Sequence, residues 1–90
     1  MTITVQFRDS WSDTVAQATR EHGEAGRVVA LLRQGQNKGS KRLIASCIEQ
    51  AGYNVAALLA FFGQPYSSIG LQTVCQLQAD AIEKGEVIIE

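Results

Sequence analysis

The strongest constraint on the fold is a stripe of residues that recurs every three or four positions in the first third of the chain. It consists of Trp11, Val15, Ala18, His22, Ala25, Val29 and Leu32. This spacing places the side chains on one face of an α-helix, as in the seam of a coiled coil. Ser10 and Asp13 indicate where the helix starts, because the serine can cap it and the acid three residues later can complete a capping box.

Two glycines interrupt this helix near its middle. Gly23 and Gly26 each cost ~1 kcal/mol relative to alanine inside a helix. One interpretation is a single kinked helix that crosses a close neighbour at its glycines. The other is a break between positions 23 and 26 that leaves two shorter helices. We favour the kinked helix.

Three further helices are predicted, each bounded by capping residues and by glycine. They span Lys41–Gln50, Val55–Phe62 and Ile69–Lys84, with caps at Ser40, at Asn54, and at Ser67 or Ser68. Gly52 is expected to end the first of them in a left-handed conformation. Gly63 and Gly85 are expected to stop the other two.

Short β-strands are predicted at both ends of the chain. Residues 2–7 alternate polar and apolar side chains, and residues 86–90 are short and β-branched. Pairing of the two strands would bring the ends of the chain together. The predicted fold is one domain over residues 1–90, mainly α with a minor α+β character: a compact bundle of three to four helices with these terminal strands.

The distribution of charge predicts contact with a second surface. The stretch from Leu43 to Ala79 carries a single charge, Glu49. Such a nearly neutral run is too long to lie wholly inside a domain of 90 residues. Large exposed apolar area usually marks a partner site. A domain this short also has a thin core. Together with the stripe, these features predict a homodimer.

Composition excludes several classes of protein. Eight basic residues against nine acidic ones give a net charge of −1, which does not support a strongly basic nucleic-acid protein. Cys47, Cys75 and His22 are too few and too scattered for a zinc site. No apolar stretch approaches the ~20 residues that span a bilayer, and the first residues lack the pattern of a signal peptide. We expect a cytoplasmic protein with reduced thiols, no metal, no cofactor and no membrane contact.

A basic loop is the first candidate site. Residues 35–42 run into a helix N-terminus, where free N–H groups and the helix dipole favour an anion. Lys38, Lys41 and Arg42 add positive charge there, and with Arg33 they are the candidate contacts for an anion or a nucleic acid. The glycine spacing differs from that of a phosphate-binding P-loop, so nucleoside triphosphate hydrolysis is rejected. The alternative is a solvated connector.

An aromatic cluster is the second candidate site. Phe61, Phe62 and Tyr66 lie close together in sequence, and Trp11 adds a fourth aromatic side chain. Neighbouring phenylalanines on a helix point ~100° apart, so we expect one inside and the other on a rim. Aromatic side chains at a rim are typical interface anchors. The alternative is that both phenylalanines are core.

The segment from Asn54-Val55 through Gly63 to Ile69 resembles the C-terminal DNA-binding helices of the factor-for-inversion-stimulation type. The resemblance implies a helix-turn-helix. The sequence departs from the family pattern at Leu58-Leu59 and at Pro65. Residues 67–73 also contain no arginine or lysine to reach a phosphate or a guanine edge. Their polar members, Ser67, Ser68, Gln72 and Thr73, could still hydrogen-bond to bases.

No catalytic constellation emerges from the residues. His22 lies on the apolar stripe, where a packed histidine is commoner than a base, and Cys47 lies among apolar residues, where a thiol is usually inert. We therefore predict a small non-enzymatic interaction protein, a regulator, adaptor or inhibitor. It would bind a protein partner through the aromatic residues and the basic loop. The alternatives are a nucleic-acid-binding regulator and, third, a small-molecule binder or enzyme that uses His22.

Overall fold

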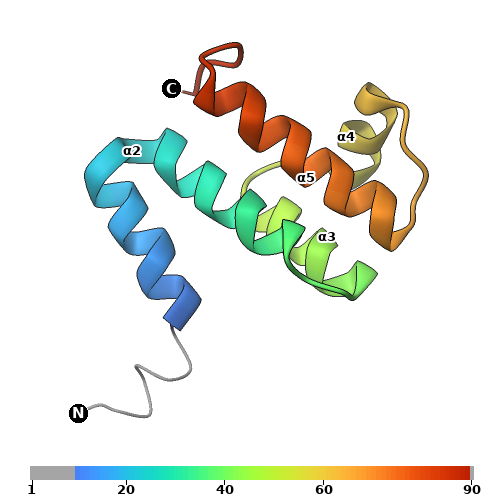
Figure 1. Cartoon of the computed structure of the whole chain (residues 1–90), viewed down its shortest axis with the longest axis horizontal. Helices are drawn as coiled ribbons and strands as arrows, with labels where there is room; N and C mark the ends of the chain where they lie inside the picture. The colour runs from blue at the N-terminus through green and yellow to red at the C-terminus, as the bar shows by residue number, and fades with distance from the viewer. Residues whose placement is uncertain (1–9, 90) are drawn as a thin grey trace.

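The computed structural model describes residues 10–89, with side chains from residue 13 onward. This part of the chain contains four helices, which confirms the mainly helical class. They are α2 (Ser10–Gln36), α3 (Lys41–Gln50), α4 (Val55–Phe62) and α5 (Ser68–Glu83). Figure 1 shows α5 beside the second half of α2, with α3 and α4 behind them in this view.

The core lies between α2, α3 and α5. Its largest fully buried side chains are Leu32, Ile44, Ile48, Leu71, Val74 and Cys75. Leu71, Val74 and Cys75 belong to a row of buried positions that follows the helical repeat along the whole of α5. The helix predicted as the last of the chain is thus the central element of the bundle.

A sharp bend divides α2 at Gly23. The backbone there has φ 71° and ψ −153°, a region that is open to glycine almost alone. The helix therefore consists of two segments, residues 10–22 and residues 24–36, and we call the first of these the arm. Of the two interpretations of the sequence, the break between positions 23 and 26 describes the structure better. Gly26 lets the arm fold back closely, because a Cβ there would clash with the Ala18 carbonyl oxygen.

The caps of α4 and α5 follow the sequence closely, whereas Ser40 occupies the N-cap position of α3 without a side-chain hydrogen bond. The Asn54 side chain accepts a hydrogen bond from the Ala57 N–H at 2.9 Å, and Gly63 ends α4 with φ 66°. The Ser67 hydroxyl accepts from the Gly70 N–H at 2.9 Å and so begins α5. The predicted bounds of α3 and α4 are confirmed, and those of α5 differ by one residue at each end.

The predicted C-terminal strand is wrong for residues 86–89, which form a bend and irregular chain. Gly85, with φ 80°, reverses the backbone after α5. The N–H groups of Glu86 and Val87 then donate to the Ala81 carbonyl oxygen at 2.9 and 3.3 Å. Val87 and Ile89 pack on the core, so their alternation reflects burial rather than strand pairing. The other predicted strand, residues 2–7, lies outside the described residues.

Within residues 10–89, no single helix is long and apolar enough to cross a membrane. Only α3 and α4 taken together reach that length and composition, and they are bent by 99° relative to each other.

Candidate functional site

The loop between α2 and α3 is held in place by the first turns of α5. Ser68 Oγ donates a hydrogen bond to the Gly39 carbonyl oxygen at 3.3 Å. Gln72 Nε2 donates to the Lys38 carbonyl oxygen at 2.7 Å. The basic loop is therefore fixed against a helix that lies about thirty positions later in the sequence.

The connection from α4 to α5 reaches the same end of the molecule as the basic loop. Figure 1 shows it running along one side, from the end of α4 to the start of α5. Ser67 N–H donates to the Pro65 carbonyl oxygen at 3.0 Å, which turns the chain before the helix. A Cβ at Gly70 would clash with that same carbonyl oxygen, so glycine permits this tight turn.

The basic loop and this connection meet at Lys41 and Tyr66. The Lys41 ammonium nitrogen lies 5.4 Å from the centre of the Tyr66 ring, within the range of a cation–π contact. Tyr66 remains 58 % exposed and Ile69 remains 75 % exposed. We call Lys41 and Tyr66, together with their sequence neighbours Lys38, Arg42 and Ile69, the Lys41–Tyr66 surface. It joins two segments that the sequence treats as separate candidates.

The two phenylalanines of α4 divide as the sequence suggests. Phe61 is 78 % exposed, whereas Phe62 is partly buried and packs against the core. Their rings meet edge to face, with centroids 4.9 Å apart. Phe61 is thus the exposed member of the pair. Trp11 belongs to the first turn of α2, and its side chain lies outside the described part of the structure.

Arg33, the remaining basic candidate, points toward α5 rather than toward the loop. Its Nη2 forms ion pairs with Asp80 Oδ1 at 2.7 Å and Glu83 Oε1 at 2.5 Å. The hydrogen bond to Asp80 is the main reason that the pKa of Arg33 is raised. Arg33 therefore ties α2 to α5. By contrast, Lys38, Lys41 and Arg42 form no ion pair within residues 10–89.

The polar side chains at the start of α5 already make hydrogen bonds within the chain. Ser67 caps its own helix and Thr73 Oγ1 donates to the Ile69 carbonyl oxygen at 2.8 Å, while Ser68 and Gln72 hold the basic loop. These are the side chains that a helix-turn-helix would offer to bases. The geometry does not favour α5 as a recognition helix, since these side chains already make hydrogen bonds and one face of the helix is buried along its length.

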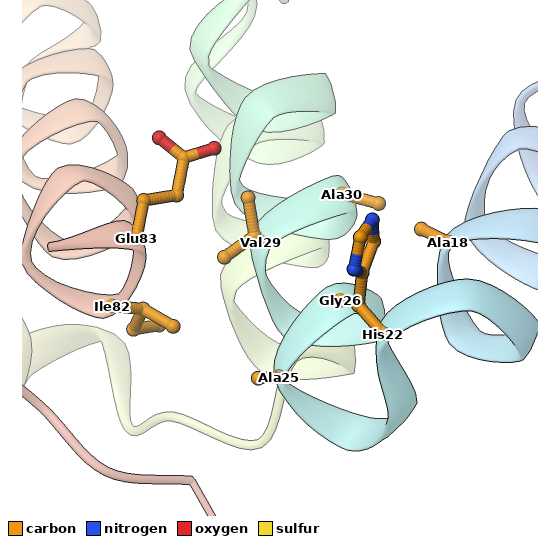
Figure 2. A pocket seen from close by; sticks show the side chains of 8 residues that line it. All are labelled: Ala18, His22, Ala25, Gly26, Val29, Ala30, Ile82 and Glu83. Atoms are coloured by element: carbon orange, nitrogen blue, oxygen red, sulfur yellow. The ribbon is translucent and has the colours of Figure 1, made fainter. Parts of the chain in front are cut away.

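A pocket of about 390 Å³ lies in the bend of α2. Figure 2 shows His22 and Ala18 from the arm on one side, Ala25, Gly26, Val29 and Ala30 in the middle, and Ile82 and Glu83 of α5 on the other. Its wall is mostly aliphatic. The nearest acid to His22 Nε2 is Glu21 Oε1 at 3.8 Å, beyond the range of a strong hydrogen bond.

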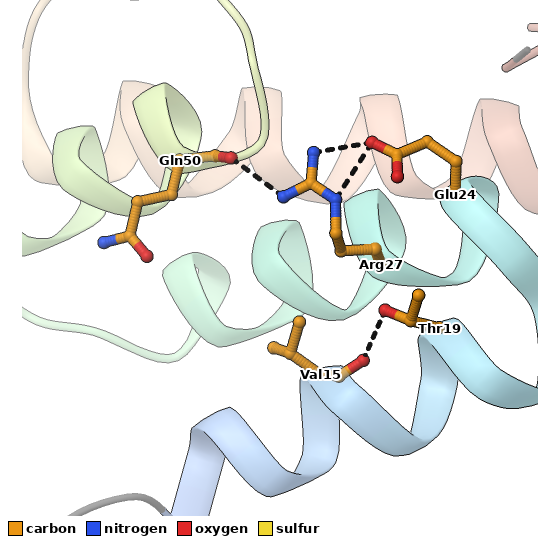
Figure 3. Close-up of polar contacts among 5 residues, drawn as sticks. All are labelled: Val15, Thr19, Glu24, Arg27 and Gln50. Carbon is orange, nitrogen blue, oxygen red and sulfur yellow. Dashed lines mark hydrogen bonds and ion pairs between the residues drawn. The ribbon is translucent and has the colours of Figure 1, made fainter.

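Arg27 links the second segment of α2 to the end of α3, as Figure 3 shows. Its Nη1 donates to the Gln50 carbonyl oxygen at 3.2 Å, and its Nε and Nη2 donate to Glu24 Oε2 at 2.9 and 2.6 Å. The hydrogen bond from Arg27 lowers the pKa of the Glu24 carboxyl. This is a structural contact, since it fixes α3 at the side remote from the basic loop.

Both cysteines are buried and reduced. Burial raises the pKa of the Cys47 thiol, and it raises that of Cys75 to about 12. Thiols in this condition are protonated at neutral pH and are poor nucleophiles. No group of three or more metal-ligating side chains occurs among the residues described.

Sequence reasoning missed Ile69 as a surface residue, because an isoleucine at a helix start was assigned simply to the helix. A signal was present: Ile69, Thr73 and Leu77 form a row on α5 that is offset from the buried row.

Comparison of the chain with models of protein families, with curated proteins and with solved structures gave no match.

Proposed function

We propose that this chain is a non-enzymatic protein-interaction module that binds an acidic segment of a partner protein through the Lys41–Tyr66 surface. The observation that carries the proposal is the contact of the Lys41 ammonium with the Tyr66 ring at 5.4 Å. It places a cation beside an exposed aromatic side chain.

The chemistry of the surface supports a protein partner. Tyr66 and Ile69 provide exposed apolar area, and aromatic residues are enriched among the side chains that dominate binding energy. Lys38, Lys41 and Arg42 add positive charges that attract an acidic segment and speed its association. The hydrogen bonds from Ser68 and Gln72 hold the basic loop, so little conformational entropy is lost on binding.

The state of the candidate catalytic groups favours a non-enzymatic role. Burial keeps the Cys47 and Cys75 thiols protonated, so neither is a ready nucleophile. His22 Nε2 lies 3.8 Å from Glu21 Oε1 and the His22 side chain is 70 % exposed, so no carboxylate among the described residues is closely bonded to orient it as a base.

The test is a pull-down from host lysate with the tagged chain, read by mass spectrometry, with and without nuclease. The same experiment is run with Tyr66→Ala, Lys41→Glu and the control Lys84→Glu, which makes the same charge change on an exposed lysine after α5. We expect a stoichiometric acidic protein that survives nuclease, is lost with the first two variants and is kept by Lys84→Glu. Equal capture by all four chains would contradict the proposal.

Binding of single-stranded nucleic acid is the alternative function. It also uses basic side chains beside exposed aromatic rings, and Lys41 with Tyr66 provides that pair. In that case the captured material is nucleic acid, its proteins disappear after nuclease, and affinity falls steeply with salt. Changing Lys38, Lys41 and Arg42 together to Glu would then abolish nucleic-acid binding.

A further inference from the structure

The sequence pattern of α2 is that of a straight helix, whereas its structure is bent. Positions Trp11 to Leu32 keep their spacing of three and four through Gly23, as they would in one continuous helix. The structure nevertheless turns back at Gly23 with a backbone conformation that few residues adopt. A single residue therefore separates the bent α2 from a straight helix of 27 residues, which would be about 40 Å long.

In the bent form the arm covers part of its own chain. The Ala18 carbonyl oxygen lies against Gly26, and Val15 packs on the core. Figure 2 shows the arm and the second segment facing each other across the pocket, with His22 at the bend. The surface that the arm covers on residues 24–36 would be left without a partner if α2 straightened.

The register of this contact is symmetrical about one position. Ala18 meets Gly26, and this pair is centred on His22. The stripe residues Val15 and Val29 are centred on His22 as well. Two straight copies of α2 placed antiparallel around His22 would therefore bring the same residues together, with each arm on the second segment of the other chain.

We propose that two copies of this chain exchange their arms, with Gly23 as the hinge, to form a dimer whose two-fold axis passes beside His22. The occupant of the surface on residues 24–36 is then the arm of the second copy. Each contact within one chain is replaced by the same contact between chains, as an isologous interface requires. A short hinge in an unusual conformation is the feature that favours such exchange.

The inference does not depend on the Lys41–Tyr66 surface, which lies at the other end of residues 24–36. It also assigns the predicted homodimer to a defined part of the molecule. Exchange preserves the contacts of the bent chain and relieves the backbone of Gly23, so the two forms differ mainly in the hinge and in the entropy of association.

The first test is Gly23→Ala, followed by sedimentation over a range of concentrations. Alanine is strained at φ 71° and favours a straight helix, so each chain should shift toward the straight form at least about tenfold. Because a dimer contains two hinges, we expect its dissociation constant to fall about a hundredfold or more.

The matched control is Gly52→Ala. Gly52 also has a positive φ, 100°, and a Cβ there meets no atom within 4 Å, but it lies in the turn after α3 and not in the hinge. We expect this variant to lose stability and to keep the oligomeric state of the parent chain. A Gly23→Ala chain that dimerises no more tightly than Gly52→Ala overturns the proposal.

The second test leaves the hinge unchanged, so it remains informative if Gly23→Ala fails to fold. His22→Cys places one new thiol per chain beside the two-fold axis, and mild oxidation should give a disulfide-linked dimer on a non-reducing gel. Gln17→Cys is the control, because Gln17 is exposed and lies further along the arm from the axis. Equal cross-linking of the two variants, or none in either, overturns arm exchange in this register.

Discussion

Gly35 lies where α2 passes close to both cysteines, and its replacement by alanine measures how tightly this part of the core is packed. A Cβ at this position would lie 3.0 Å from Cys47 Cβ and 3.1 Å from Cys75 Sγ. Alanine gains ~1 kcal/mol over glycine in a helix, whereas overpacking a core costs about 1–3 kcal/mol. Both neighbours are buried on helices that cannot easily withdraw, so we expect the packing cost to be larger.

The expected result is a fall of about 1 kcal/mol in the free energy of unfolding of Gly35→Ala, the difference between those two effects. A domain of this size has only about 5–13 kcal/mol in total, so the loss is measurable. The assay is urea unfolding followed by circular dichroism. Gly39→Ala is the control, because a Cβ there meets no atom within 4 Å and should leave stability unchanged or raise it by up to about 1 kcal/mol.

A double-mutant cycle identifies the cause of the loss. Cys75→Ala removes the sulfur that the new methyl group would touch, so Gly35→Ala should cost about 1 kcal/mol less in that background. The reasoning is refuted if Gly35→Ala stabilises the chain as Gly39→Ala does. A loss that is the same with and without Cys75 would assign the packing cost to Cys47 Cβ, the other close neighbour, rather than to the sulfur.

Three further predictions concern single groups. Asn54→Ala removes the cap on the Ala57 N–H and should cost about 1 kcal/mol in urea unfolding. With its pKa raised to about 12, native Cys75 should resist iodoacetamide at pH 8, as mass spectrometry can show, and react once unfolded. In the unfolded chain the pKa of this thiol is 9.0. Its contribution to the free energy of unfolding is therefore complete below pH 9 and is lost as the pH rises toward 12. The Glu24 carboxyl should titrate below 4.5 by NMR, and Arg27→Gln should return it toward that value.

The helices after Gly39 could be predicted because their signals are local. Asn54 and Ser67 cap with their own side chains, and Gly63 stops α4 through its own left-handed backbone. Each of these interactions involves residues within about one helical turn, so the sequence contains all the information needed. The bounds of α4 were correct for this reason, whereas Ser40 takes the N-cap position of α3 without a side-chain hydrogen bond.

Sequence reasoning is weakest where distant residues decide the outcome. Arg33 was grouped with Lys38 and Lys41, which follow it closely in the sequence, and the structure shows it paired with Asp80 and Glu83 of α5. The alternation at residues 86–89 indicated a strand, yet Val87 and Ile89 are half-buried because they pack on a helical core. Pairing partners fifty positions away leave no trace in a local pattern.

The arm and the Lys41–Tyr66 surface are separated by the length of the second segment of α2, and this separation gives the proposed dimer a consequence for binding. Figure 1 shows the bend of α2 at one end of that segment and the loop that leads into α3 at the other. Exchange at the bend would therefore leave both copies of the surface uncovered. Two linked sites on one partner, or on two neighbouring partners, raise the effective concentration of the second contact without any new interaction. Gly23→Ala should then slow dissociation from an immobilised partner, whereas Tyr66→Ala in the same chain should remove the gain.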